Sequence, residues 1–568
     1  MDNLQRPVLE PVCSSPAGSH PTNPSMLLLV YAGSTIYALY LSPLSRFPGP
    51  KLWAISRIPG QLSVLQGRNH LDILALHERY GPVVRISPNE LAFNTPQAFR
   101  DIYGARPGGC FAKDRSHYLP PANGIDHLVC AVDNAVHTRQ RRLLAHAFSE
   151  RALRDQEGLT RGYVDTMIGK LRAHITKGHS PRVDINNWMN YTTFDITGDL
   201  MFGESFDCLK DSRLHPWIQL IFSSMKALAI AGVANQSPIL GTIFHALIPK
   251  EVKRKAIQHF DLAAQKVDRR LETNMTRPDF ISAILQNGLS EAKGQYLDGE
   301  RIMTRAEIHS NAFILIVAGS ETSATLLSGC IFYLCTNPLT MSRLVSEIRS
   351  IFAKEDEITF RNAASLPYLA AVIEESLRMH PPFVTSLARV VPPDGSIVDG
   401  HYVPGGTVAA CHHYASYHST SNFSFPHTFL PERWLGQDSR FNRDKRDVLQ
   451  PFSLGPRNCL GKNLAYCEIR LILWDIARFH DRNACNTNLA MQGFARGLHT
   501  FIRLNPSALG LVPDKLMATT MEAIIGAVFL DSNQNMDIAR NVIVELGLLE
   551  SDCWQGTLAY LSCCYMPR

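Results

Sequence analysis

The sequence lacks the features that mark several common protein classes. Its formal net charge is only +5 over 568 residues, too weak an excess to indicate a nucleic-acid partner. It has no internal repeat and no low-complexity tract. Hydrophobic residues make up 45% of the chain and charged residues 19%, which is typical of a globular protein and argues against wholesale disorder. We therefore expect a large folded protein that does not bind nucleic acid.

Paired cysteines are also missing. The 13 cysteines are scattered, and no two of them have the C-x-x-C spacing. An odd number without paired spacing is not typical of a disulfide framework or of a zinc site. The pattern indicates reduced thiols facing the cytosol, and it leaves room for a single cysteine with a special role.

Near the N-terminus the chain has a single long uncharged apolar run. Residues 26–44 carry no charge and as a helix would span roughly 28 Å, close to the ~30 Å of a bilayer core. The polar residues 1–25 have no basic start and no small-residue cleavage site, so an anchor is favoured over a signal peptide. Arg46, Lys51 and Arg57 follow the segment. The positive-inside rule then predicts one transmembrane helix, with the rest of the chain in the cytosol.

The body of the chain is predicted to be mainly α-helical with small β-sheets. Residues 82–86 and 90–93 flank a Ser-Pro-Asn turn and predict a hairpin, and short strands return near residues 401–410. Thr304 and Glu307 have the spacing of a capping box, and no proline follows until Pro338, so a helix of about 33 residues is expected. The middle of this helix is apolar almost all round, which predicts that it lies in the core.

The strongest chemical pattern is FSLGPRNCLG at residues 452–461. Cys459 precedes a helical pattern, and backbone N–H groups at a helix N-terminus lower the pKa of a thiol. Gly455 and Gly461 let the backbone approach a flat ligand, and Arg457 can reach a carboxylate on that ligand. The alternative is a buried structural cysteine beside a glycine turn.

The stretch from Phe452 to Gly461 matches F-x-x-G-x-R-x-C-x-G at every fixed position, and the chain therefore resembles the cytochrome P450 family. The resemblance implies haem b with the Cys459 thiolate as axial ligand of the iron, and it places Phe452, Arg457 and Gly461 in the cofactor site. The expected haem domain covers residues 46–508. The expected fold is the cytochrome P450 fold, preceded by the membrane anchor.

A second motif, AGSETS at residues 318–323, falls in the middle of the predicted long helix. It resembles the oxygen-binding groove of the family. The resemblance gives Gly319 the role of leaving space for dioxygen, Thr322 that of a hydrogen-bond donor to bound oxygen, and Glu321 that of a proton source. The alternative is that Thr322 only bonds a backbone carbonyl one turn back.

Further cofactor contacts are implied by weaker matches. His137 and Arg141 have i,i+4 spacing and share one helix face. The resemblance places both near a haem propionate, and Arg389 is a further candidate for the same role.

A scaffold cluster is also implied. Glu375 and Arg378 have i,i+3 spacing, for which an exposed surface pair is the default interpretation. Together with Arg433 they match the buried Glu-Arg-Arg cluster of the family, and we assign them to support of the haem rather than to catalysis.

The function implied by the resemblance is that of a monooxygenase in the endoplasmic reticulum membrane. It would insert one oxygen atom of O2 into a small hydrophobic substrate, with electrons from NADPH through cytochrome P450 reductase and with cytochrome b5 as an alternative second donor. Residues 80–91 and 459–466 are most similar to fungal secondary-metabolism members, whose substrates are terpenoids, polyketides or alkaloids. Two alternatives stay open, a haem-thiolate isomerase or dehydratase and an inactive haem protein.

The C-terminal part departs from the family pattern. Residues 481–505 resemble the closing strands of the family only loosely. Residues 517–532 resemble the second half of a ribonuclease III catalytic domain, with Glu522 at the matching acidic position and Thr519 where that family has a second acid. A lone glutamate cannot assemble a two-metal site. We expect residues 509–568 to be a non-catalytic helical appendage, and an RNA-processing role has no other support.

Overall fold

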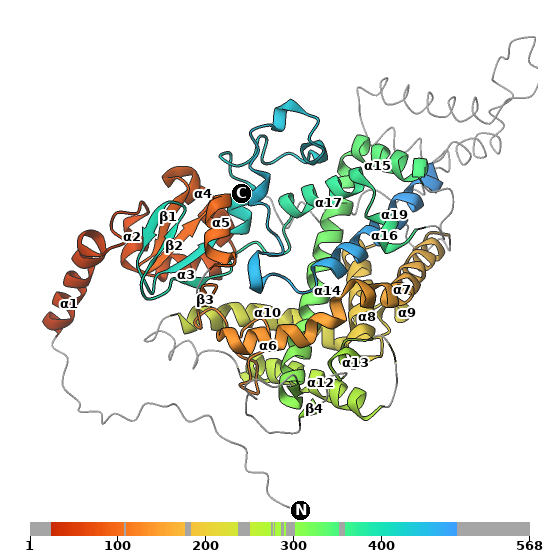
Figure 1. Ribbon diagram of the computed structural model, residues 1–568, viewed down its shortest axis with the longest axis horizontal. Helices are drawn as coiled ribbons and strands as arrows, with labels where there is room; N and C mark the ends of the chain where they lie inside the picture. The colour runs from red at the N-terminus through yellow and green to blue at the C-terminus, as the bar shows by residue number, and fades with distance from the viewer. Residues whose placement is uncertain are drawn as a thin grey trace, which may run out of the picture.

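The computed structural model describes residues 24–106, 109–176, 183–236, 250–273, 277, 279–285, 289–290, 302–351 and 358–484. The protein is mainly helical with small mixed sheets, as the sequence predicted (Figure 1). The predictions for the first 23 residues, for most of residues 481–505 and for the appendage at 509–568 lie outside the described residues.

A five-stranded sheet lies at one end of the molecule, in the order β1-β2-β9-β6-β3 (Figure 1). Its strands are β1 (Val83–Ser87), β2 (Glu90–Phe93), β3 (Ala112–Lys113), β6 (Arg389–Val390) and β9 (Val408–Cys411). The predicted hairpin is present as the antiparallel pair β1–β2, and β2 runs parallel to β9. The sheet therefore joins early segments of the chain to the segment around Arg389.

Short helices surround this sheet. They are α2 (Lys51–Ile55), α3 (Ile58–Leu65), α4 (Asn69–Tyr80), α5 (Pro96–Tyr103) and α18 (His413–Tyr417). The apolar core between these elements includes the buried rings of Phe93, Phe99 and Tyr417. Two further pairs of strands are β4 (Leu289–Ser290) with β5 (Met303–Thr304) and β7 (Ser396–Val398) with β8 (His401–Val403).

The long helix α14 (Arg305–Thr336) runs through the helical part of the molecule (Figure 1). The predicted capping box is present, because the Glu307 N–H donates to Thr304 Oγ1 at 3.1 Å and the Thr304 N–H donates to Glu307 Oε2 at 3.0 Å. The helix ends before Pro338, as predicted. Its neighbours in the main core are α8 (Ile185–Phe202), α12 (Lys250–Glu272), α17 (Pro367–Met379) and α19 (Lys462–Ala484). This helix is the central element on which the site is built.

The other helices of this part follow in chain order. They are α6 (Asn134–Ala145), α7 (Glu150–Thr176), α8 (Ile185–Phe202), α9 (Cys208–Asp211), α10 (Pro216–Asn235), α12 (Lys250–Glu272), α13 (Phe280–Leu285), α15 (Pro338–Ile351), α16 (Phe360–Ala363), α17 (Pro367–Met379) and α19 (Lys462–Ala484).

The apolar helix near the N-terminus ends earlier than predicted. Helix α1 (Pro24–Ile36) continues as the π-helical turn η1 (Tyr37–Leu41). Leu44, predicted to lie in the bilayer, is only 3% exposed and packs in the core beside the sheet. The Ala38 carbonyl accepts a hydrogen bond from Arg85 Nη1 at 2.7 Å. The last residues of the predicted span therefore belong to the protein body.

Within the described ranges, one helix is long and apolar enough to cross a membrane, and it is α14. Half of its apolar window is buried inside the protein, as expected of a core helix. The N-terminal helix is shorter and apolar.

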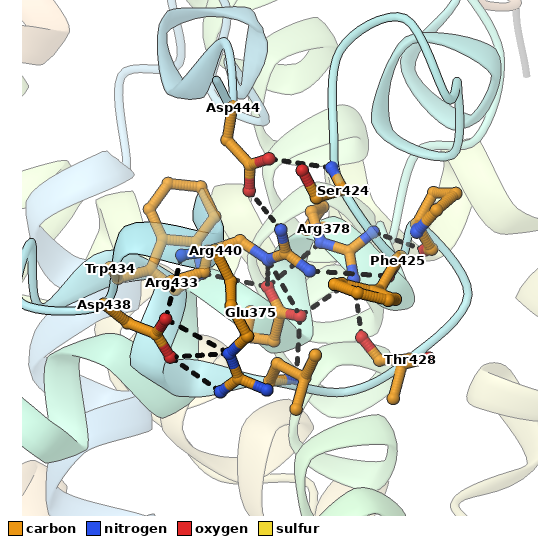
Figure 2. Close-up of polar contacts among 12 residues, drawn as sticks. Glu375, Arg378, Ser424, Phe425, Thr428, Arg433, Trp434, Asp438, Arg440 and Asp444 are labelled. Atoms are coloured by element: carbon orange, nitrogen blue, oxygen red, sulfur yellow. Dashed lines mark hydrogen bonds and ion pairs between the residues drawn. The ribbon is translucent and has the colours of Figure 1, made fainter. Parts of the chain in front are cut away.

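A buried ion cluster ties α17 to the segment that leads to Cys459 (Figure 2). The Glu375 carboxylate accepts hydrogen bonds from Arg378 Nη2 at 2.8 Å, from Arg433 Nε at 3.1 Å and from Trp434 Nε1 at 2.9 Å. Arg433 and Trp434 belong to the 3-10 turn η4 (Pro431–Trp434). The Glu375, Arg378 and Arg433 side chains are 0% exposed, so the surface-pair alternative does not apply.

The sequence did not predict the fourth member of this cluster. Asp444 forms an ion pair with Arg433, and its side chain is also fully buried. Two carboxylates then face two guanidinium groups, and Arg378 also donates to the carbonyls of Pro426 and Thr428. The cluster is neutral and fully hydrogen-bonded, which is the condition under which buried charge is tolerated.

We expect Arg433→Met to lower the free energy of unfolding by about 3–5 kcal/mol, because it leaves two buried carboxylates with a single cation. Thermal or urea unfolding measures the change. The control is Arg440→Met, which removes the exposed 2.6 Å pair with Asp438 in the same segment and should have no measurable effect. Equal losses in the two variants would contradict this account.

Candidate active site

Cys459 lies in the loop between the 3-10 turn η7 (Gly455–Arg457) and α19. Its backbone N–H donates to the Phe452 carbonyl at 2.8 Å, which closes the loop. Gly455 has a φ of +69°, and a Cβ there would lie 2.1 Å from the Tyr103 carbonyl oxygen, so this turn requires glycine. The loop holds the thiol at the start of α19 and leaves it exposed.

The surface of the Cys459 side chain is exposed, but desolvation by the protein around it raises the pKa of the thiol above its ordinary value. The N–H groups of Gly461 and Lys462 and the charge on Arg141 lower the pKa, but desolvation outweighs them. The prediction of a lowered pKa was therefore wrong for the free thiol, because it counted the helix N-terminus and left out desolvation. A metal ion bound to the sulfur would deprotonate it regardless.

The middle of α14 has an exposed face even though the helix lies in the core. Ala318 and Thr322 are both exposed and lie one turn apart, whereas Ile316, Ser320 and Ala324 are buried. An exposed face inside a packed helix borders an internal space. Helix α14 packs against α19, which begins directly after the Cys459 loop.

The Thr322 hydroxyl donates to the Ala318 carbonyl at 2.7 Å. This is the structural role weighed as the alternative from the sequence. The bond occupies the hydroxyl hydrogen and leaves the oxygen lone pairs free to accept. Thr322 can therefore accept a hydrogen bond there and, after rotation, donate one.

Glu321, beside Thr322, is half-buried. Its Oε2 atom is buried and has no hydrogen-bond partner within the described part of the chain. Burial raises the pKa of the Glu321 carboxyl. A carboxyl in this state is suited to carry a proton into the site.

Gly319 faces helix α8 rather than the internal space. A Cβ at this position would lie 3.0 Å from Thr197 Cγ2 and 3.2 Å from Thr197 Oγ1. The described contacts thus give Gly319 a packing role, because glycine lets α8 and α14 approach closely. The predicted role of Gly319 in making space for dioxygen stays a prediction.

Two predicted arginines lie next to the cysteine loop. Arg141 on α6 donates to the Asn458 carbonyl at 2.6 Å and to Asn458 Oδ1 at 2.5 Å. Arg457 donates to the carbonyls of Ala131 and Val132 at 2.5 and 2.8 Å. Burial lowers the pKa of both guanidinium groups. They tie the cysteine loop to α6 and to the segment that precedes it.

A third predicted arginine, Arg389 on β6, is buried and donates to the Tyr118 hydroxyl at 3.1 Å. The residue opposite it on β3 is Lys113, which is 7% exposed and was not predicted as a site residue. Its ammonium group donates to the Val129 carbonyl. The pKa of Lys113 lies well below its ordinary value, first because of burial and then because of the charges on Arg389 and Arg457.

These cations share no carboxylate. In the part of the chain that the structure describes, no ion pair joins an acid to any of the four, which are Lys113, Arg141, Arg389 and Arg457. His137 lies among them, and burial together with their charges lowers its pKa to about 3. Buried positive charge of this density calls for an anionic ligand.

The residues present fit a haem. Its iron needs an axial thiolate, its carboxylates need cations, and its flat face needs room. Cys459 supplies the sulfur and the four cations supply the charge. A Cβ added at Gly461 would contact only Phe148, at 3.8 Å, so protein atoms do not fill the space next to this glycine. Phe452 is half-buried in the same loop.

The fold and this site define a haem-thiolate protein. Residues 47–480 match the cytochrome P450 family, and the chain belongs to that family. It is a cytochrome P450 monooxygenase of fungal secondary metabolism.

Curated relatives cover most of the chain. The cytochrome P450 monooxygenase astJ of Aspergillus oryzae is 46% identical over 442 residues, 77% of this chain and 86% of that protein. The trichothecene C-15 hydroxylase of Fusarium sporotrichioides is 42% identical over 439 residues, 77% of this chain and 87% of that protein. The averantin hydroxylase of Dothistroma septosporum is 41% identical over 447 residues, 79% of this chain and 82% of that protein. The ribonuclease III likeness of residues 517–532 gains no support from these matches.

We expect Lys113→Met to have opposite effects on the two forms of the protein. It should stabilise the apoprotein, because a buried unpaired cation is removed, and it should weaken haem binding. Transfer of haem to apomyoglobin should be roughly tenfold faster, the effect of losing about 1.4 kcal/mol. Lys51→Met, at an exposed lysine, should change neither the apoprotein stability nor the transfer rate. Slower or unchanged haem loss in Lys113→Met would contradict the assignment.

Proposed function

We propose that this chain binds haem b through Cys459 and inserts one oxygen atom of O2 into a small hydrophobic secondary metabolite. The observation that carries the proposal is an exposed Cys459 thiol at the start of α19, a helix that packs against α14 with its exposed Thr322. Around His137 lie cations that form no ion pair with an acid among the described residues. When bound, haem supplies the activation of dioxygen. The protein supplies binding, orientation, protons and exclusion of water.

Each residue has a distinct task in this proposal. The Cys459 sulfur would ligate the iron, and Lys113, Arg141, Arg389 and Arg457 would hold the haem carboxylates. His137 is neutral and contributes a hydrogen bond rather than a charge. Gly461 and Phe452 border the flat face of the haem.

Proton delivery falls to α14. The Glu321 carboxyl accepts protons from solvent and passes them towards the internal space, where the Thr322 hydroxyl orients the acceptor oxygen. An unpartnered Glu321 oxygen and an exposed Thr322 favour oxygen chemistry over isomerisation or dehydration, neither of which needs a proton supply at this position.

The substrate class rests on the relatives. Two of them are named as hydroxylases, which favours hydroxylation by this chain as well. The terpenoid, polyketide and alkaloid classes are the candidates that we propose.

We also place the protein on the endoplasmic reticulum membrane, anchored by one N-terminal helix, with the catalytic body in the cytosol. Leu29, Tyr40 and Leu41 on α1 and η1 are exposed apolar side chains, and basic residues follow them. The cytosolic position suits NADPH–cytochrome P450 reductase as the electron donor, with cytochrome b5 as an alternative second donor.

Cys459→Ala tests the ligand directly. The dithionite-reduced wild-type protein with carbon monoxide should show the strongly red-shifted Soret band of a haem thiolate, and the variant should not. Cys467→Ala, a half-buried thiol further along the same segment, is the matched control and should keep the band. A red-shifted band that survives in Cys459→Ala would refute the assignment.

Thr322→Ala tests the proton route. We expect the red-shifted band to persist while electrons from NADPH go to hydrogen peroxide instead of product or water, with the peroxide-to-water ratio rising by about 10²-fold or more. The control is Thr336→Ala, which also removes a hydroxyl bonded to a carbonyl one turn back on α14, but at the far end of the helix. An unchanged ratio in Thr322→Ala would show that this hydroxyl only bonds its own helix.

A further inference from the structure

A carboxyl group without a cation lies between α14 and α19. Glu468 on α19 is 2% exposed and forms no ion pair within the described residues. Its Oε2 atom lies 3.4 Å from the Ser323 hydroxyl of α14. An isolated buried carboxyl is costly to the fold. Nothing in the proposed proton route uses Glu468, so its position calls for another explanation.

Ser323 follows Thr322 directly, and successive residues of a helix point about 100° apart. Thr322 is exposed to the internal space, whereas Ser323 is 3% exposed and contacts α19. The contact therefore fixes the rotation of α14 at the turn that carries Thr322. It does so against α19, the helix that begins next to Cys459.

We propose that Glu468 is a positioning residue, which holds Ser323 and thereby aims the Thr322 hydroxyl into the space beside Cys459. The inference rests on the proposed function, because the aim of Thr322 matters only if oxygen is activated there. Glu468 itself touches neither substrate nor haem in this account.

The charge state of Glu468 makes the contact sensitive to pH. Burial raises the pKa of Glu468 from its ordinary value of 4.5 to about 8, so near pH 7 the group is mostly a neutral acid. A neutral acid can both donate to Ser323 and accept from it. Above pH 8 a carboxylate stands there, and Ser323 is its one hydrogen-bond donor within the described residues.

The surrounding titratable groups do not offset this charge. Cys467 on the same helix has a pKa raised to about 11, first by burial. Glu157 of α7 acts on the same thiol and is itself an acid, and Glu374 of α17 accepts a hydrogen bond from Tyr466 at 2.6 Å. Arg470 acts on Cys467 and lies over the Tyr466 ring without an ion pair to Glu468.

The raised pKa also links Glu468 to stability. The folded protein holds this proton more tightly than the unfolded chain does, so stability falls as pH rises from about 4.5 to about 8 and then levels off. Glu468→Gln removes this dependence. The thermal midpoint of the wild type should drop relative to Glu468→Gln across that window, a readout that needs no catalysis.

The functional test uses the full-length holoprotein with reductase, NADPH and dioxygen and no organic substrate. The measurement is the ratio of hydrogen peroxide to water formed. Glu468→Leu and Ser323→Ala should raise this ratio roughly tenfold at pH 7, because a displaced Thr322 orients oxygen poorly. Glu468→Gln should match the wild type at pH 7, because an amide can replace the neutral acid. Cys467→Ala controls for lost packing on α19 and should have no effect.

The pH profile separates positioning from packing. The wild-type ratio should rise as pH passes 8, and the Glu468→Gln ratio should stay flat. A flat wild-type profile, a high ratio in Glu468→Gln at pH 7, or equal effects of Glu468→Leu and Cys467→Ala would each overturn the proposal. The red-shifted carbon monoxide band is recorded for every variant. Its absence from the wild type would instead count against the proposed function itself.

Discussion

Charge buried away from water has to be neutralised, and two clusters in this chain meet that requirement differently. Glu375, Arg378, Arg433 and Asp444 neutralise one another within the protein (Figure 2). Around His137, by contrast, the cations form no ion pair with an acid in the part of the chain that the structure describes. The first cluster is neutral without a ligand, whereas the second keeps an excess of positive charge. The second cluster therefore requires an anionic ligand, and its position next to Cys459 makes that ligand part of the active site.

The remaining architecture keeps this site in place. The five-stranded sheet brings Lys113 and Arg389 together across paired strands, although they lie far apart in the chain. Helix α6 carries Arg141 to the cysteine loop, and α14 carries the exposed Thr322. The α19 helix follows the thiol and packs against α14. Sheet and helices thus contribute different parts of the proposed site: Lys113 and Arg389 come from the sheet, and Arg141 comes from α6.

Local patterns in the sequence predicted the local structure well. The capping box at Thr304 and the alternation at residues 83–93 each depend on neighbouring residues, and both features are present.

Features that depend on distant contacts were missed. Lys113 lies in a two-residue strand and belongs to no sequence motif. Its place in the cation cluster is evident only from its pairing with Arg389 on the neighbouring strand. Asp444 stands among exposed basic residues, and no short pattern reveals that it is buried against Arg433. The packing of Gly319 against Thr197 is likewise a contact between distant segments, which no local pattern predicts.

The central claim is that the Cys459 sulfur ligates a haem iron. Resonance Raman spectroscopy on the purified full-length protein, grown with natural or heavy-isotope sulfur in cysteine, tests it most directly. The account predicts an iron–sulfur stretching band that shifts to lower frequency with heavy sulfur and disappears when Cys459 alone is replaced. A haem-bound protein with no sulfur-sensitive band would contradict the account, because the iron would then be held by a different ligand.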